Sequence, residues 1–359
     1  MDAFLHDKSI LIVSPEPWDH IFVSKHHYAI RLAARNNRVF FLQPPGNRRL
    51  GIDATGYNNI WVISYTGFPR GLRFYPGIVR KAVLRKKFHA IQKAAATSFD
   101  IVWSFDNSVF FDFDALPGDV ITISHIVDLN QHFQTRLAAR SATFCLCTTE
   151  LILNRLRKYN SRVYRIHHGC NVADIREDLR LPGRGKVKAV YAGNLGMPYL
   201  DWHPIHYTAR ENPDVDFIFI GPEGTNTERN IDGIHKLPNV YFPGKIGSNE
   251  LQSLLAQADI LMVCYKEVYQ EEQANPHKMM EYLLSGKVIV TTHTAEFVEC
   301  RDLLVMTERN SDWAAQFGLV RANLTQYNDE GLQRRRRAYA LDNTYEKQIE
   351  RIENVLLNG

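Results

Sequence analysis

The stretch that decides the fold is residues 259–291, DILMVCYKEVYQEEQANPHKMMEYLLSGKVIVT. Apolar side chains fill 260–264 and 288–290, which predicts two buried strands at 259–264 and 287–291, and the pattern of 279–284 predicts a helix between them. A strand, a crossover helix and a second strand form the unit from which parallel sheets are built. The stretch therefore predicts a parallel α/β sheet.

The helix in this stretch has clear boundary signals. Asn275 is a good N-cap residue, Pro276 fits the first helical position, and Gly286 fits the position just past the end. The helix follows a strand, so it begins at the carboxyl edge of the sheet. Its free backbone N–H groups make that edge a site for an anion.

Two charged residues sit at the start of the same helix. Lys278 lies in the first turn, where the helix dipole disfavours a cation by roughly 0.3–1 kcal/mol, and a bound phosphate would reverse that cost. Glu281 follows on the same face, where a carboxylate can accept both hydroxyls of a ribose. The alternative is a solvated Lys–Glu pair; the cap, proline, glycine and edge position together favour a nucleotide site.

Outward from this stretch, strand and helix patterns alternate along the whole chain of 359 residues. The predicted strands are 9–13, 38–42, 59–64, 100–104, 120–124, 143–148, 162–167, 187–192, 216–220 and 240–242. A Gly- and Pro-containing linker at 180–186 separates two such series. We predict two doubly wound, Rossmann-like α/β domains, at 1–175 and 186–340, and a C-terminal helix at 341–359.

The charge is unevenly divided between the two halves. The net charge of +4 comes from +10 over residues 1–172 and −6 over the remainder. Between Asp53 and Asp100 there are eight Lys or Arg and no acidic residue. This predicts an anionic partner for the first domain.

Several function classes are disfavoured by missing motifs. The first strand is followed by Ser14-Pro15-Glu16-Pro17 and not by G-x-G-x-x-G, and the chain has no P-loop, no H-E-x-x-H and no G-x-S-x-G. The five cysteines form no C-x-x-C pair and predict buried thiols in a reducing compartment. We expect no signal peptide and no membrane-spanning segment.

The segment NPHKMMEYLLSGKVIV at 275–290 resembles the donor-site signature of GT-B glycosyltransferases, especially family-4-like enzymes of bacterial surface polysaccharide synthesis. Further similarities lie in YAGNL at 191–195, FIFIGP at 217–222, the segments 237–245 and 254–260, RIHHGCN at 165–171 and NTYE at 343–346. The resemblance implies two domains facing across a cleft and a terminal helix that crosses back to the first domain. It implies a hexosyltransferase-type enzyme that moves a sugar from a UDP- or GDP-sugar, with no cofactor and no metal.

The resemblance also assigns donor-binding residues in the second domain. Glu281 matches the second glutamate of the family's E-x7-E motif, and Gln273 stands where the first would be. The positions expected to approach the diphosphate or the sugar are Gly193, Asn194, Asn275, His277 and Lys278. Lys245 is a substitute for the family's usual Arg/Lys pair.

In the first domain, His125 and Asp128 follow a predicted strand, and either is a candidate for contact with the sugar or for a base. A structural role for His125 is equally open. His26 and His27 are weaker candidates, because a helix can simply present them to solvent. The resemblance implies a retaining mechanism. Asp112-Phe113-Asp114 matches the metal-binding D-x-D of a different glycosyltransferase fold, and we interpret it as a solvated turn.

The basic stretch predicts an amphipathic helix over about 78–96. Its cations include Arg73, Arg80, Lys81, Arg85, Lys86 and Lys87. Anionic lipid headgroups attract such surfaces, and acceptors of surface-polysaccharide transferases are often lipid-linked. We expect a cytoplasmic protein that docks on the inner face of the membrane; a merely solubilising face is the alternative, and nucleic acid is disfavoured.

Three functions remain open at this level. The leading one is transfer of a sugar from a nucleotide donor to a glycan or lipid-linked acceptor. The others are a non-hydrolysing sugar-nucleotide epimerase and a non-catalytic relative that binds nucleotide-sugar or glycan.

Overall fold

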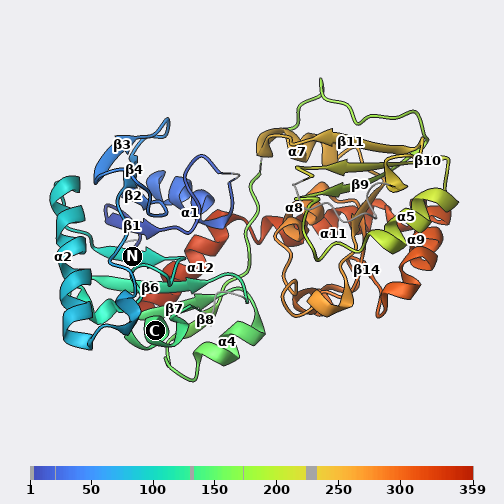
Figure 1. Cartoon of the computed structure of the whole chain (residues 1–359). Coiled ribbons are helices and arrows are strands. Elements are labelled where there is room, and N and C mark those ends of the chain that lie inside the picture. Colours follow the sequence, from blue (N-terminus) through green and yellow to red (C-terminus); the bar gives the residue numbers. More distant parts are fainter. Residues whose placement is uncertain (1–3, 21, 130–132, 173, 224–232, 359) are drawn as a thin grey trace. The chain divides into compact units, whose positions relative to one another are not determined.

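The computed structural model of the chain consists of two compact units, Met1–His168 with Tyr345–Gly359, and Gly169–Thr344 (Figure 1). It describes residues 4–20, 22–129, 133–172, 174–223 and 233–358. The predicted domain boundaries were 1–175, 186–340 and 341–359. In the structure the first unit ends at His168 and includes the terminal helix.

The first unit is built on an eight-stranded sheet in the order β3-β4-β2-β1-β5-β6-β7-β8. Its strands are β1 Ser9–Val13, β2 Arg38–Leu42, β3 Gly51–Ala54, β4 Ile60–Ser64, β5 Ile101–Ser104, β6 Ile121–Ile126, β7 Phe144–Cys147 and β8 Val163–Arg165. Its helices are α1 Ser24–Ala33, α2 Gly77–Ala95, α3 Thr135–Ser141, α4 Glu150–Leu156 and α12 Tyr345–Asn358, with 3₁₀ turns Leu72–Phe74 and Phe113–Ala115. Every predicted strand of this half is present.

The edge strand β3 is a departure from the predicted all-parallel sheet. It pairs antiparallel with β4, while the other neighbours in this sheet run parallel. Its sequence, GIDA, has partly or fully exposed side chains and gives no apolar run to recognise. A short, polar edge strand beside a turn is therefore invisible to an argument from hydrophobic patterning.

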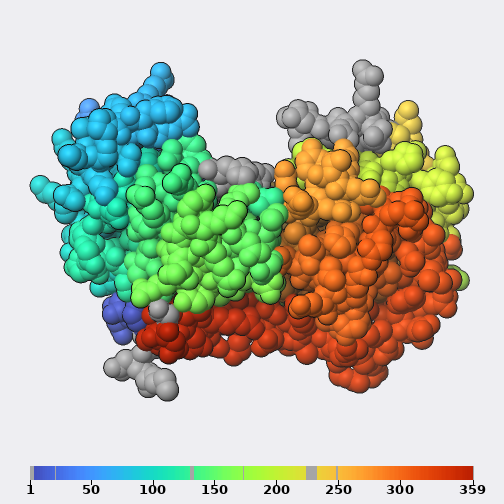
Figure 2. Space-filling view, turned by 90° about the horizontal axis from the view of Figure 1, so that it is seen from below, coloured from blue at the N-terminus to red at the C-terminus, as the bar shows by residue number. Residues whose placement is uncertain are grey.

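The faces of the first sheet are covered by different helices. Side chains of α2, α3 and α4 pack with Leu11 and Phe40 on one face. On the other face, α1 and α12 pack with Ile10 and Trp103. The terminal helix α12 places Tyr345, Ile349, Ile352 and Leu356 in that core, and it forms part of the surface of the first unit (dark red in Figure 2).

The second unit has a six-stranded parallel sheet in the order β11-β10-β9-β12-β13-β14. The strands are β9 Val187–Ala192, β10 Val215–Ile220, β11 Val240–Gly244, β12 Ile260–Val263, β13 Val288–Thr291 and β14 Val305–Met306. The helices are α5 Trp202–Glu211, α7 Ser248–Leu255, α8 Lys278–Ser285, α9 Trp313–Ala322, α10 Leu324–Tyr327 and α11 Glu330–Leu341, and the 3₁₀ turns are Glu267–Tyr269, Ala295–Cys300 and Asn310–Asp312. The chain order reverses between β9 and β12, and doubly wound sheets bind ligands at the carboxyl ends of such strands.

The start of α8 differs from the prediction. The helix begins at Lys278, with His277 as its N-cap, and not at Pro276 after an Asn275 cap. The Met279 N–H donates to the Pro276 carbonyl at 3.0 Å, so the chain enters the helix through a tighter i to i−3 turn. Gly286 ends the helix as predicted.

The cysteines and the hydropathy of the helices can also be compared with the sequence expectations. All five cysteines are buried and unbridged, in agreement with the sequence. Among the described residues, no helix is long and apolar enough to cross a membrane.

Candidate functional site

The carboxyl ends of β9 and β12 bring together a lysine and two tyrosines. Tyr191 belongs to β9, Tyr265 follows β12, and Lys278 is the first residue of α8. Lys278 Nζ donates to the Tyr191 hydroxyl at 3.0 Å and to the Tyr265 hydroxyl at 2.7 Å. We call Tyr191, Gly193, Tyr265, Lys278 and Glu281 the Lys278 site.

The lysine is held by rings as well as by hydroxyls. Its Nζ lies 4.5 Å from the ring centroid of Tyr191 and 5.2 Å from that of Tyr265. A cation above an aromatic face is attracted by the ring quadrupole. The ammonium group is thereby fixed at the switch point of the sheet, half-buried, at a helix N-terminus.

The two ionisable groups of the site are both perturbed by burial. Desolvation lowers the pKa of Lys278 to about 7, although the charge of Glu281 opposes this shift. Desolvation also raises the pKa of Glu281 to about 7, against the effect of Lys278. Among the described residues, none donates a hydrogen bond to the Glu281 carboxylate within the structure. A ligand that pairs with the ammonium and the carboxylate would therefore stabilise the charged forms of both groups.

Two glycines keep the backbone close to the lysine. Gly193 has φ 153°, and a Cβ there would lie 2.8 Å from Lys278 Nζ. Gly221, after β10, has φ 143°, and a Cβ there would lie 1.8 Å from the Gly193 carbonyl oxygen. Any other residue at Gly221 would push the Gly193 turn, so both glycines shape the site.

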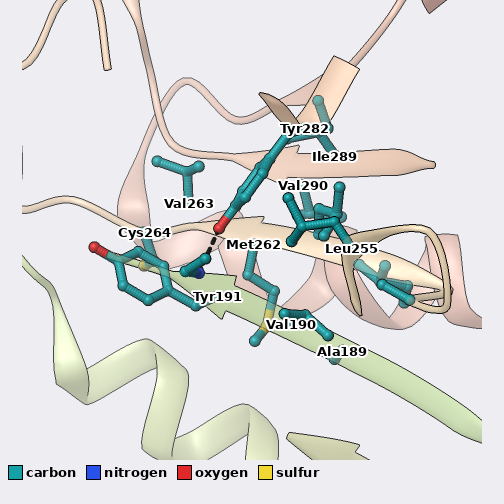
Figure 3. Packing of buried hydrophobic residues seen from close by; sticks show 14 of the residues in the cluster. Ala189, Val190, Tyr191, Leu255, Met262, Val263, Cys264, Tyr282, Ile289 and Val290 are labelled. Carbon is teal, nitrogen blue, oxygen red and sulfur yellow. Dashed lines mark hydrogen bonds between the residues drawn. The ribbon is translucent and has the colours of Figure 1, made fainter. Parts of the chain in front are cut away.

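Helix α8 is fixed to the end of β9 by a further tyrosine. The Ala192 N–H donates to the Tyr282 hydroxyl at 2.7 Å, marked by a dashed line in Figure 3. The ring of Tyr282 lies among the apolar side chains of the sheet, including Val263 and Val290. The Lys278 site is therefore built on rigid, buried elements.

Comparison with solved structures agrees with this geometry. Sucrose-phosphate synthase from Thermosynechococcus elongatus superimposes with a TM-score of 0.68 over 98% of both chains, at 10% identity. Anabaena Alr3699/HepE in complex with UDP and glucose superimposes with a TM-score of 0.67 over 98% of this chain and 100% of that one, at 12% identity. The fold is that of the GT-B glycosyltransferases. The predicted fold class is confirmed.

Sequence comparison points to the same enzymes. Residues 199–319 match the family model "Glycosyl transferases group 1". TuaH of Bacillus subtilis (strain 168), a predicted teichuronic acid biosynthesis glycosyltransferase, is 30% identical over 113 residues, which are 32% of this chain and 28% of TuaH. The predicted resemblance to GT-B glycosyltransferases is confirmed, and the residues that match the family model include Tyr265, Lys278 and Glu281.

The other predicted donor residues of this GT-B fold lie around the same sheet edge. Asn194 is exposed, and its Oδ1 accepts the Gly196 N–H at 3.0 Å. Lys245 is exposed directly after β11. Asn275 is buried, while Gln273 and His277 are half-buried just before α8. Their contacts with a donor remain predictions.

His125 lies at the carboxyl half of β6, enclosed by aromatic rings. Its Nδ1 accepts the Trp103 indole N–H at 3.2 Å, and its ring centroid is 4.7 Å from that of Phe105. Burial, with Lys25 nearby, lowers the pKa of His125 to about 3. A base with that pKa accepts a proton poorly at neutral pH, so the geometry favours the structural alternative that the sequence left open.

Asp128 is exposed in the turn after β6. The nearby cation is Lys25, which is buried at the start of α1 and forms an ion pair with Glu16. His26 and His27 are both buried, not presented to solvent, which corrects the sequence interpretation. His26 Nε2 lies 3.1 Å from the Pro17 carbonyl oxygen.

The D-x-D sequence is not a solvated turn, which is a second correction. Asp112 is buried, and the Arg80 guanidinium donates to its Oδ2 at 2.8 and 3.0 Å. Lys81 pairs with the exposed Asp114 at 2.9 Å. The two aspartates therefore anchor α2 to the unit, and among the described residues no group of three or more His, Cys, Asp or Glu is arranged to hold a metal.

The remaining basic residues of α2 divide between surface and contacts. Arg85 and Lys86 are exposed, as is Arg73 in the 3₁₀ turn before α2, although the Arg85 Nε donates to the Ala115 carbonyl at 3.2 Å. Lys87 donates to the Thr66 carbonyl at 3.0 Å. Several of the cations that we expected to bind an anionic partner therefore form contacts within the first unit instead.

Two residues of the Lys278 site, and a glycine that shapes it, escaped sequence reasoning. Tyr191 and Gly221 stand in stretches quoted for their resemblance, and Tyr265 follows the β12 strand, yet none of the three was predicted to act. Their positions at the carboxyl ends of strands are the signal that would have found them.

Proposed function

We propose that this protein transfers a sugar from a nucleotide-sugar donor to a glycan or lipid-linked acceptor. The observation that carries the proposal is Lys278, held by Tyr191 and Tyr265 at the N-terminus of α8. When the bond between the sugar and the diphosphate breaks, negative charge develops on the leaving phosphate oxygen. A fixed ammonium at the positive end of the α8 dipole stabilises that charge in the transition state.

The donor is proposed to be a UDP- or GDP-sugar bound across the Lys278 site. Glu281 lies one helical turn from Lys278, so its carboxylate accepts the ribose hydroxyls while Lys278 contacts the diphosphate. The similar Anabaena protein has structures with UDP and with UDP-glucose, which supports a nucleotide donor. Retention of the anomeric configuration belongs to the same proposal and rests on the family resemblance.

The acceptor is proposed to be a surface polysaccharide intermediate presented at the inner face of the membrane. The match to a protein of teichuronic acid biosynthesis supports the first part. The second part is supported by the residues around the start of α2, where Phe74 is 76% exposed, Ile78 87% and Val79 46%, beside the exposed Arg73. Exposed apolar side chains beside a cation match the interface of an anionic bilayer.

A donor screen tests the transfer reaction. The protein is incubated with UDP-, GDP- and dTDP-sugars, and nucleoside diphosphate release and sugar identity are measured with and without acceptor extract. Release that disappears in Glu281→Ala and persists in the exposed control Glu330→Ala supports transfer. An altered sugar still bound to its nucleotide would instead identify an epimerase, and binding without turnover a non-catalytic relative.

A further inference from the structure

A groove lies on the outer surface of the second unit, between α5 and α9, which are neighbours in the fold (Figure 1). Its volume is about 710 Å³, within the range of small-molecule binding sites. None of the proposed roles of the Lys278 site uses the side chains that line it.

The groove combines an exposed aromatic ring with hydroxyl, amide, imidazole and carboxylate groups. Tyr207 is 48% exposed, and the Arg210 guanidinium lies 5.5 Å from its ring centroid, outside the lining. His203 and Glu211 are exposed along the same helix. A flat ring that packs against C–H groups, surrounded by planar polar groups, is the chemistry that recognises a sugar ring.

The charges of the lining select among ligands. Asp201 and Glu211 are acidic, His203 is the one titratable nitrogen base, and the described lining contains no lysine or arginine. Arg210, beside the groove, is already paired with Glu211 at 3.0 Å, so an anionic glycan or a phosphate would meet carboxylates and no free cation in the described lining. The groove therefore favours an uncharged chain of sugars.

One end of the groove is bonded to the Lys278 site. Asn310 donates its side-chain amide to Asp201 Oδ2 at 2.6 Å and to the Tyr265 backbone carbonyl at 2.8 Å. The hydroxyl of the same Tyr265 accepts from Lys278. Asn310 Oδ1 is buried and accepts no hydrogen bond from any described residue, so one acceptor at this end is left unsatisfied.

We propose that the groove between α5 and α9 binds an uncharged oligosaccharide, with Tyr207 as the platform for one sugar ring. The role of that oligosaccharide as an extended acceptor or product rests on the proposed transferase function. Binding itself does not, because all lining residues lie within one unit and apart from the nucleotide contacts.

Binding is measured on the full chain by saturation-transfer NMR with maltotetraose, cellotetraose and chitotetraose, and with tetragalacturonate as the anionic comparison. We expect saturable binding of at least one neutral tetrasaccharide and none of tetragalacturonate. Tyr207→Ala should weaken the affinity at least tenfold, and Ala315→Arg, which fills the groove, should abolish it. Leu319→Ala, an exposed change on α9 outside the groove, should leave it unchanged.

The groove is excluded as a glycan site if no neutral tetrasaccharide binds, or if Tyr207→Ala and Leu319→Ala have equal effects. UDP titration of the same variants separates this result from the transferase proposal. Oligosaccharide binding that depends on Tyr207, without any UDP binding, would support the groove as a glycan site and exclude the transferase function. UDP binding that is equal in all variants, without oligosaccharide binding, would exclude the groove as a glycan site and leave the transferase proposal unchanged.

Discussion

The hydroxyl of Tyr265 lies 2.7 Å from the ammonium nitrogen of Lys278, at the point where the strand order of the second sheet reverses. The tyrosine orients the lysine, but a neutral hydroxyl does not balance its charge. The cost of holding a desolvated cation is therefore left for a ligand to offset.

Lys278→Met should separate binding from stability. Loss of the charge should weaken UDP-glucose binding by about tenfold to a hundredfold, the effect of one charge-assisted hydrogen bond. The Tm should rise, because the desolvated ammonium is gone, and the difference should shrink as the pH rises from 7 toward the ordinary lysine range. Isothermal titration and thermal unfolding check both; a lower Tm with unchanged affinity would contradict the assignment.

UDP-glucose affinity should peak near pH 7. Above that pH, Lys278 loses its proton, since burial lowers its pKa to about 7. Below it, Glu281 gains a proton, since burial raises its pKa to about 7. Titration from pH 5.5 to 9 should give a bell, with the alkaline limb missing in Lys278→Met and the acid limb missing in Glu281→Gln. A flat profile in the parent protein would refute this.

Gly221→Ala should disrupt the site through its backbone. The added Cβ overlaps the Gly193 carbonyl, so we expect a loss of more than about 1 kcal/mol in the free energy of unfolding and of nucleotide binding. Gly318→Ala is the matched control, because nothing lies within 4 Å of its Cβ position in α9. That helical substitution should stabilise by roughly 0.5–1 kcal/mol. Equal effects of the two changes in denaturant titrations would argue against a special role for Gly221.

Arg336→Met should be strongly destabilising. The buried guanidinium donates to the carbonyls of Leu303 at 2.7 Å, Tyr327 at 2.9 Å and Gly286 at 3.1 Å. Leaving three buried acceptors without donors should cost about 3 kcal/mol in urea unfolding. Arg334→Met, in an exposed position two residues earlier, should change stability by less than about 0.5 kcal/mol.

Docking on lipid should depend on both the apolar and the cationic residues near the start of α2. Flotation should recover the protein with vesicles that contain anionic lipid and not with purely zwitterionic ones. Each exposed cation contributes roughly 1 kcal/mol, so Arg73→Gln should reduce binding severalfold, and Phe74→Ala with Ile78→Ala should abolish it. Val268→Ala, which changes an equally exposed apolar residue of the second unit, is the control. Binding independent of anionic lipid would reject the proposal.

Hydrophobic patterning was sufficient for the central strands, because buried parallel strands are continuous apolar runs. It did not find β14, which has two residues, or the polar edge strand β3. By its charge alone, the run of arginines at 334–337 is typical of a solvated helix face, yet Arg336 is buried. Four successive arginines give no local sign of which one meets three carbonyls from distant loops.

The candidate site was predictable only in part for a related reason. Lys278 and Glu281 stand close together beside recognisable helix boundaries. The partner Tyr191 is 87 residues away in the chain, and its contact depends on which strands are neighbours in the sheet. Sequence spacing carries no information on that contact until the strand order is known.

The terminal helix α12 returns the chain to the first unit, and this has a topological consequence. The second unit is one uninterrupted insertion, and its two ends, Cys170 and Thr344, are paired in a parallel bridge. The Cys170 N–H also donates to the Asn343 carbonyl at 3.1 Å. The second unit is thus encoded as one continuous segment that leaves and re-enters the first unit at adjacent points. Exchanging residues 169–344 between relatives would therefore replace the whole second unit. The two junctions would be neighbours in space, and the core formed by α1 and α12 would stay intact.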